Sequence, residues 1–222
     1  MPSFPDFSHS GSTGPGSTGP GSTGPGSTGS GPDVPALVRA HVTRALDLGE
    51  PAAASVTFLG VDPVTVLRYG PSASRMVHYV SCGCSASPMG DPADMLADPL
   101  RGPRAEIVLR LRGGADEVLR SFAVIAAAPA VEGLILAEDA LIDLSEPLWP
   151  GSAFTAVLLG PSILPPVELP EPSSPVEFLD AVPITATEAA WMRIKGAGAL
   201  REAWTEAGID TTDPARSAVR IT

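Results

Sequence analysis

Three residues in one short stretch of the chain have side chains that bind metals or act as nucleophiles. His78, Cys82 and Cys84 share one parity, so an uninterrupted strand would place all three on one face of a sheet. An imidazole and two thiolates could bind zinc and leave the fourth coordination position open. Gly83 is expected to end that strand, and no fourth ligand lies nearby in the sequence. We therefore expect small buried or half-buried thiols here, and no metal or other cofactor.

The serines next to these cysteines do not complete a nucleophilic site. A nucleophile elbow has a second glycine and joins a strand to a helix, whereas Gly83–Ser87 lacks that glycine and leads into a proline-rich loop. The sequence also contains no glycine-rich phosphate-binding motif. It thus predicts a protein without catalytic residues. The alternative is a hydrolase or metal-dependent enzyme that uses His78, Cys82 and Cys84.

An acidic run later in the chain is the better candidate for a contact surface. The run consists of Glu138, Asp139, Asp143 and Glu146. These carboxylates could bind a cation, although solvated loop residues account for them more simply. Trp149 and Phe154 follow closely, and aromatic side chains supply much of the affinity at protein interfaces. We expect Asp139, Asp143, Glu146 and the two aromatic residues to contact a protein partner.

The charge of the chain narrows the class of that partner. The formal net charge is −11, which repels nucleic acid and anionic membranes and favours a basic or weakly polar protein surface. No apolar run approaches the ~20 residues needed to span a bilayer. Two cysteines make no disulfide framework, and the first residues do not resemble a signal peptide. These features predict a cytoplasmic protein that binds neither nucleic acid nor membrane.

The first 32 residues differ in character from the rest. Gly11–Pro15, Gly16–Pro20 and Gly21–Pro25 are identical GSTGP repeats. Because the repeats have no apolar side chains to bury, nothing offsets the entropy of ordering them. Residues 1–32 are therefore predicted to be a disordered arm that acts as a spacer. The alternative is a scaffold subunit whose Phe4 and Phe7, which precede the repeats, dock in the groove of a partner.

Residues 33–222 contain the patterns of one folded domain. Asp33 is a plausible N-cap for a helix that ends at Gly49, and Ala115–Ala128 has a wide apolar stripe and is followed by Pro129. Thr185 and Glu188 have the spacing of a capping box at the start of a further helix, which is interrupted by glycines and then resumes.

The strands predicted between these helices do not alternate with them strictly. Their composition is rich in β-branched, aromatic or otherwise apolar residues. The predicted strands are Ser55–Leu59, Val64–Tyr69, Arg75–Ser81, Ala105–Leu111, Leu134–Ala137, Ala153–Leu159 and Val176–Val182. Pro161–Pro175 holds too many prolines for a central strand and is expected to be a loop or an edge cover. The order favours an α+β fold, a mixed β-sheet flanked by helices.

Several blocks of sequence, in their order, resemble the suppressor of fused domain family. The most specific is a strand that ends in Val182-Pro-Ile-Thr185 before a helix bearing Glu188. The other blocks are Leu67–Gly70, His78–Met89, Glu106–Leu111, Leu119–Phe122, Leu144–Trp149 and Thr155–Gly160. Together they extend over most of residues 34–208, and the chain is similar to a short bacterial member.

The resemblance implies a suppressor-of-fused-like single domain that binds proteins and has no catalytic residues. Animal relatives hold a transcription factor through a short added strand, and bacterial relatives are proposed as immunity proteins that neutralise toxins by direct binding. The partner implied is thus a protein, a toxin or a regulator. The loop after Gly160 is a contact region by position, although its Pro-Ser-Ile-Leu-Pro-Pro run departs from the animal pattern.

Overall fold

The described part of the chain begins with a capped helix. The computed structural model describes residues 32–90, 98 and 100–220, so the predicted arm, with Phe4 and Phe7, lies outside it except for its last residue. Helix α1 (Val34–Leu46) begins where the Asp33 carboxylate accepts a hydrogen bond from the Ala36 N–H at 3.1 Å. The prediction of this helix is confirmed. Its C-cap is Asp47, which adopts a left-handed conformation, so the helix ends before the predicted Gly49.

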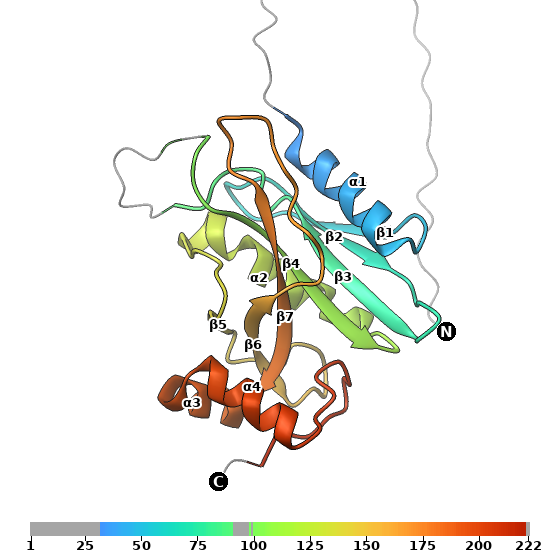
Figure 1. Ribbon diagram of the computed structural model, residues 1–222, viewed down its shortest axis with the longest axis vertical. Helices are drawn as coiled ribbons and strands as arrows, with labels where there is room; N and C mark the ends of the chain where they lie inside the picture. Colours follow the sequence, from blue (N-terminus) through green and yellow to red (C-terminus); the bar gives the residue numbers. More distant parts are fainter. Residues whose placement is uncertain (1–31, 91–97, 99, 221–222) are drawn as a thin grey trace, which may run out of the picture. The chain divides into compact units, whose positions relative to one another are not determined.

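One mixed sheet of seven strands forms the centre of the domain (Figure 1). The strand order is β1-β2-β3-β4-β7-β6-β5. All neighbours are antiparallel except β4 and β7, which run parallel. The strands are β1 (Ala52–Val56), β2 (Val64–Tyr69), β3 (Met76–Cys82), β4 (Arg104–Arg112), β5 (Leu141–Asp143), β6 (Phe154–Pro161) and β7 (Val176–Thr185). This architecture confirms the predicted α+β class.

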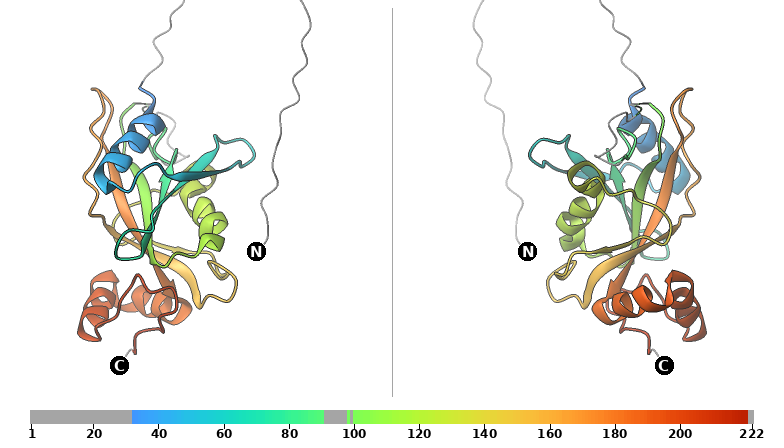
Figure 2. Two further views of the ribbon diagram at one scale, coloured as in Figure 1. Left: turned by 90° about the vertical axis from the view of Figure 1, so that its right-hand side faces the viewer. Right: turned by 90° about the vertical axis from the view of Figure 1, so that its left-hand side faces the viewer.

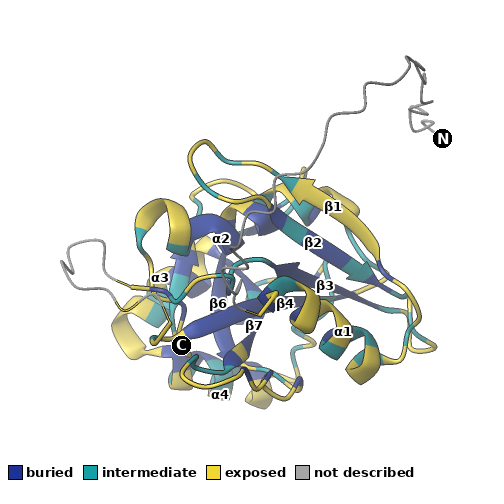
Figure 3. Ribbon diagram, turned by 90° about the horizontal axis from the view of Figure 1, so that it is seen from above, coloured by how far each residue is buried: buried dark blue, intermediate teal, exposed yellow. Residues whose placement is uncertain are grey.

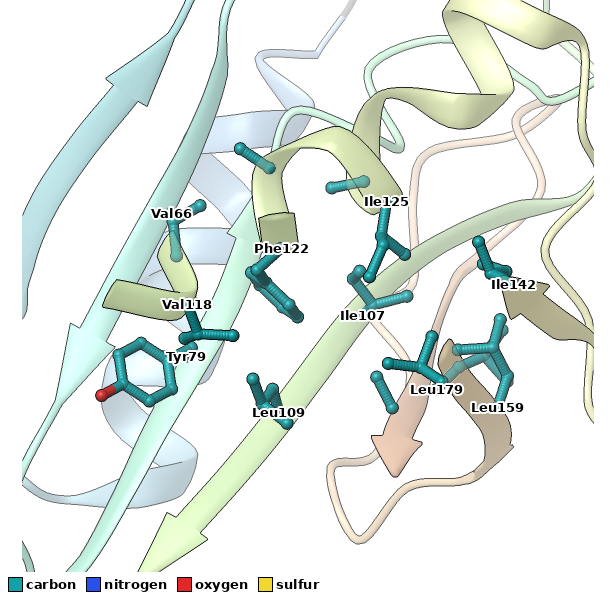
Figure 4. Packing of buried hydrophobic residues seen from close by; sticks show 14 of the residues in the cluster. Val66, Tyr79, Ile107, Leu109, Val118, Phe122, Ile125, Ile142, Leu159 and Leu179 are labelled. Carbon is teal, nitrogen blue, oxygen red and sulfur yellow. The ribbon is translucent and has the colours of Figure 1, made fainter. Parts of the chain in front are cut away.

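Helix α2 (Leu119–Glu132) covers one face of the sheet. A 3-10 turn, η1 (Asp116–Val118), leads into it. Phe122 and Ile125 of the helix pack on strand residues such as Ile107 and Leu179 and form the largest core (Figure 4). Since side chains alternate along a strand, residues of the opposite parity face the other side.

The other face is covered at its two ends by different elements (Figure 2). At one end, α1 and the loop after β6 bury a cluster that includes Val38, Leu164 and Phe178. At the other end, α3 (Ala186–Lys195) and α4 (Ala197–Glu206) bury a cluster around Leu158 and Trp204. None of the helices in the described ranges has the length and apolar character to cross a membrane.

Three predicted elements differ from the structure. Strand β1 lies three residues before the predicted Ser55–Leu59, because Val56 pairs with Val64 and the residues between them form the turn. Leu134–Ala137 is not a strand; β5 occurs instead at Leu141–Asp143. Pro129 lies inside α2, which continues until Gly133 adopts a left-handed conformation (φ 69°) and donates to the Pro129 carbonyl at 3.1 Å.

Glu188 of the capping box at the start of α3 also forms a buried ion pair with Arg216. Glu188 is 0% exposed and accepts from the Thr185 N–H at 2.9 Å, as the sequence predicts. Its carboxylate also accepts from the Trp204 indole at 3.0 Å, from both terminal nitrogens of Arg216 at 2.8 and 3.1 Å, and from the Val219 N–H at 3.2 Å. One side chain thus links the end of β7, both C-terminal helices and the last described segment.

Replacement of Glu188 with glutamine is expected to destabilise the protein by about 3–5 kcal/mol, because it leaves the Arg216 charge buried without its partner. Burial raises the pKa of Glu188, but the hydrogen bonds from Arg216, Thr185 and Trp204 outweigh it, so the pKa lies below the usual value. The stabilisation is therefore present above the unfolded-state pKa of about 4.3 and is lost as the pH falls through the lower folded-state pKa.

Urea unfolding of Glu188→Gln and wild type, measured from pH 7 to acid, checks both statements. Glu202→Gln, an exposed change on α4, is the matched control and should leave the free energy of unfolding within about 0.5 kcal/mol of wild type. Equal stability of Glu188→Gln and wild type at neutral pH would contradict the proposed importance of the buried pair.

Candidate functional site

The two cysteines and the histidine do not form a common site. Cys82 belongs to the cluster beneath α1, where its thiol donates to the Pro35 carbonyl at 3.3 Å. Cys84 lies after the strand and packs against the core on the α2 side. Among the residues that the structure describes, no group of three or more histidine, cysteine, aspartate or glutamate residues is placed to hold a metal. The two thiols of the proposed metal or nucleophile group thus lie in different core clusters, Cys82 beneath α1 and Cys84 on the α2 side.

The chemistry of these side chains is that of buried structural groups. Burial raises the pKa of the Cys82 thiol to about 12 and also raises that of Cys84, so neither is a thiolate at neutral pH. Burial, assisted by the nearby Arg110 charge, lowers the pKa of His78. Arg110 itself forms an ion pair with Asp180 across β4 and β7.

The turn after β3 is organised by a carboxylate that the sequence did not single out. Glu106 in β4 is 0% exposed and accepts from the N–H groups of Gly83 and Ser85, each at 3.0 Å, and from the Ser85 hydroxyl at 2.6 Å. The Ser81 hydroxyl donates to it as well. Arg104 completes the turn by donating to the Ser85 carbonyl at 2.7 Å. The Cys-Gly-Cys-Ser stretch is therefore a structural turn, and a lone glutamate in an apolar strand was the available signal.

A groove lies where β4 and β7 begin and where the chain leaves β6. We call it the proline-loop groove, because prolines 161, 165 and 166 of the loop after β6 line one side. Its volume is about 630 Å³, and its other walls include Leu136, Glu138, Glu177 and Phe178. The structure thus gives the loop after Gly160 a concave surface beside it.

Large apolar side chains are exposed around this groove. Ile163 of the proline loop lines the groove and is 68% exposed. Leu134 and Ile135, which directly precede the lining residue Leu136, are 36% and 45% exposed, and Val131 in the last turn of α2 is 55% exposed. Nothing among the described residues accepts a hydrogen bond from the Ile135 N–H. In the segment Leu134–Ala137, which the sequence predicts as a strand, Leu134 donates to the Ala128 carbonyl, and the buried Leu136 donates to the Met89 sulfur. Ile135 is therefore the residue that combines an exposed side chain with an N–H for which the described residues provide no acceptor.

The acidic run lies next to this surface and is partly neutralised by the chain itself. Asp139 forms an ion pair with Arg201 of α4, and Asp143 forms one with Arg193 of α3. Hydrogen bonds from Arg193 and from the Ser145 N–H hold the pKa of Asp143 below its usual value. Glu146 is exposed and has no ion-pair partner in the described part of the chain.

The two aromatic residues expected at the interface differ in exposure. Phe154 is 2% exposed and lies beneath the Arg216 guanidinium, 4.9 Å from the ring centroid. Trp149 is half-buried and tilts against Phe154 with 5.6 Å between centroids. Phe154 therefore belongs to the core, which corrects the expectation that it faces a partner, while part of Trp149 remains accessible.

Comparisons with known proteins agree with the fold. The family model for "Suppressor of fused protein (SUFU)" matches residues 60–217. No curated protein sequence matches the chain. A SUFU homologue from Neisseria gonorrhoeae FA 1090 has a similar structure (TM-score 0.63, 18% identity), with 86% of this chain and 98% of that chain covered.

Two further solved structures are similar. A chain of the Sufu–Fu complex has a TM-score of 0.63 and 15% identity, with 86% of this chain and 93% of that chain covered. Drosophila Suppressor of Fused has a TM-score of 0.62 and 15% identity; the match covers 85% of this chain and 52% of that one. At these identities the similarity to solved structures establishes the shared fold.

Alkylation of the thiols tests the description of the turn. Because the pKa of Cys82 is raised to about 12, its thiolate fraction at neutral pH is roughly 1,000-fold below that of a free cysteine. Iodoacetamide should label Cys82 in the native protein far more slowly than in urea, as measured by peptide mass spectrometry. Native labelling at the rate of the denatured control would contradict the buried, protonated state.

Proposed function

The chain belongs to the suppressor of fused protein family, and from this premise we propose that it acts by binding another protein at the proline-loop groove. The family is one of protein-interaction domains, and one similar structure is a complex, Sufu–Fu. The single observation that carries the proposal is the groove itself, because its wall includes the 68%-exposed Ile163 and the exposed Leu134 and Ile135 directly precede its lining residue Leu136, and exposed apolar side chains beside a hollow mark interaction sites.

The backbone beside the groove supports an extended partner segment. Ile135 lies in a stretch outside the sheet, and no described residue accepts from its N–H. A short strand from the partner could pair with this stretch while its alternate side chains contact Leu134 or enter the groove. Ile163, on the opposite wall, supplies a second apolar contact.

The charges favour a basic partner. Glu138 and Glu177 line the groove, and Glu146 extends the acidic surface toward the half-buried Trp149. Asp139 and Asp143 belong to the same proposed surface, but they also hold Arg201 and Arg193. A partner that brings basic side chains would therefore contact Glu138 and Glu146 first.

We further propose an immunity-type role, in which the protein neutralises a toxin by binding it directly. A regulator held at the same surface is the alternative partner, and in neither case does the protein act as an enzyme. The cytoplasm is the proposed location, which the two free thiols support. The arm of residues 1–32 would serve as a spacer, or tether the domain as a scaffold subunit through Phe4 and Phe7.

Substitution of the exposed isoleucines is expected to weaken the interaction. Ile135→Glu and Ile163→Glu each place a charge in the apolar contact, and each should weaken binding roughly tenfold or more. The measurement is affinity capture from the native cells with the full chain, followed by titration of the identified partner. Ile194→Glu is the matched control, since Ile194 is 78% exposed but lies on α3. The proposal is wrong if the first two variants bind as wild type does.

Charge reversal of the acidic surface is expected to slow association more than it speeds dissociation. The double variant Glu138→Lys with Glu146→Lys leaves the pairs of Asp139 and Asp143 intact, so the fold should retain its stability. Its association rate should fall severalfold at low salt and approach that of wild type at high salt, as measured by surface plasmon resonance. Glu202→Lys on α4 is the control; an equal effect there would mean that net charge, and not this surface, is responsible.

A further inference from the structure

The first strand of the sheet has one free side. β1 lies at one end of the strand order, and among the described residues it pairs only with β2. In an antiparallel pair, alternate residues direct their N–H and C=O groups away from the neighbour, so β1 presents a row of such groups outward. Its first four residues are exposed, and Figure 3 shows β1 at the rim of the sheet beside the buried β2.

Pro51 directly precedes β1, but from Ala52 to Val56 the described structure shows none of the usual protection of an edge strand. Proteins blunt exposed edges with lysine, proline, a bulge or a covering element, whereas β1 reads Ala-Ala-Ala-Ser-Val and pairs in regular register from Ala52 to Val56. The strand at the opposite edge, β5, has only three residues. Because the side chains of β1 are small, they would not obstruct the backbone of another strand that pairs along its free edge.

An apolar pocket adjoins the end of this edge. The hairpin formed by β1 and β2 projects beside α2 (Figure 2), and a pocket of about 810 Å³ lies between its tip and the helix. Phe58 and Leu59 of the tip and Pro129 of α2 line it, together with Met89 and Cys84. Since β1 runs directly into the tip, a strand added along β1 would carry its own end to this pocket.

The acidic residues at the two ends of β1 indicate that the added strand carries basic residues. Glu50 precedes β1 and Asp62 follows its tip, and both are exposed. Glu50 meets only the exposed Arg39, at 3.4 Å, and Asp62 has no ion-pair partner within the described ranges. If a second copy of the chain paired its β1 antiparallel to this one, centred on Ala54, Glu50 of each chain would lie near Asp62 in the hairpin tip of the other. The two carboxylates would repel each other at both ends of the paired strands, so a second copy is the less favourable occupant.

We propose that the β1 edge is a second protein-binding site, which accepts an extended segment of a basic partner by strand addition. Backbone pairing with Ala52–Val56 supplies the main contact. Basic residues at both ends of the segment meet Glu50 and Asp62, and one apolar side chain enters the pocket beside Leu59. This site is independent of the proline-loop groove, with which its lining shares only Met89.

Peptide binding to the isotopically labelled full chain tests the proposal. The probe is a peptide of about nine residues that alternates threonine and valine, with a leucine near one end and lysine at both ends; its counterpart has glutamate at both ends. The lysine peptide should shift the amide resonances of Ala52–Phe58 and Cys84 and protect alternate β1 amides from exchange. It should bind roughly tenfold more tightly than the glutamate peptide at low salt, and less so at high salt.

Variants separate the edge from its charges. Of Ala53→Pro and Ala54→Pro, one removes an outward N–H while it keeps the ladder to β2; that variant should retain its melting temperature and lose the peptide. Glu50→Lys with Asp62→Lys should reverse the preference between the two peptides, whereas Glu206→Lys on α4 should not.

Three outcomes overturn the proposal: no binding of either peptide, shifts confined to other elements, or equal affinity for both peptides. A dimer in light scattering that the proline variant dissociates would also overturn it, because the edge would then be covered by a second copy.

Discussion

The C-terminal third of the domain depends on one buried carboxylate. Glu188 has no access to water, so its charge is tolerable only because donors from three segments surround it: the end of β7, α4 and the last described segment. Arg216 is equally buried and lies between the rings of Phe154 and Trp204. Without this pair, the last segment would keep the packing of Val219 in the cluster around Trp204 but lose its buried ion pair, and Phe154 would lose the guanidinium that covers it. A second buried carboxylate, Glu106 in β4, fixes the turn after β3 in the same way.

These internal contacts determine which charged and apolar side chains remain available on the surface to bind a partner. Arginines that might have made the surface basic are occupied by Asp139, Asp143, Asp180 and Glu188 within the chain. The remaining exposed acids therefore set the electrostatic character. Of the exposed large apolar residues, Ile163 lines the proline-loop groove, and Leu134 and Ile135 directly precede its lining residue Leu136, whereas Leu59 and Ile194, the two most exposed, lie elsewhere. The groove exists because the loop after β6 must pass over the start of β7, where Val167 pairs with Val176 in an isolated bridge.

Local patterns were enough to predict most of the elements, but not their partners. α1, β2 and the Thr185–Glu188 box follow from spacing within a few residues. The position of β1 depended on its register with β2, which no local propensity specifies. Leu134–Ala137 has the composition of a strand but no neighbour to pair with, and Phe154 is buried because Arg216, far along the chain, covers it. The acidic run was found from the sequence, whereas its arginine partners were not, since they come from α3 and α4.

The parallel pairing of β4 with β7 divides the sheet into two antiparallel meanders. β1 to β4 form one and β5 to β7 form the other, and within the described ranges only the β4–β7 ladder joins the two. Strands about 70 residues apart must meet there, and closing so long a loop costs entropy that local pairing avoids. We therefore expect each meander to form early in folding and the seam to close last. The chain would then be most vulnerable to non-native pairing while the inner edges of β4 and β7 are still open.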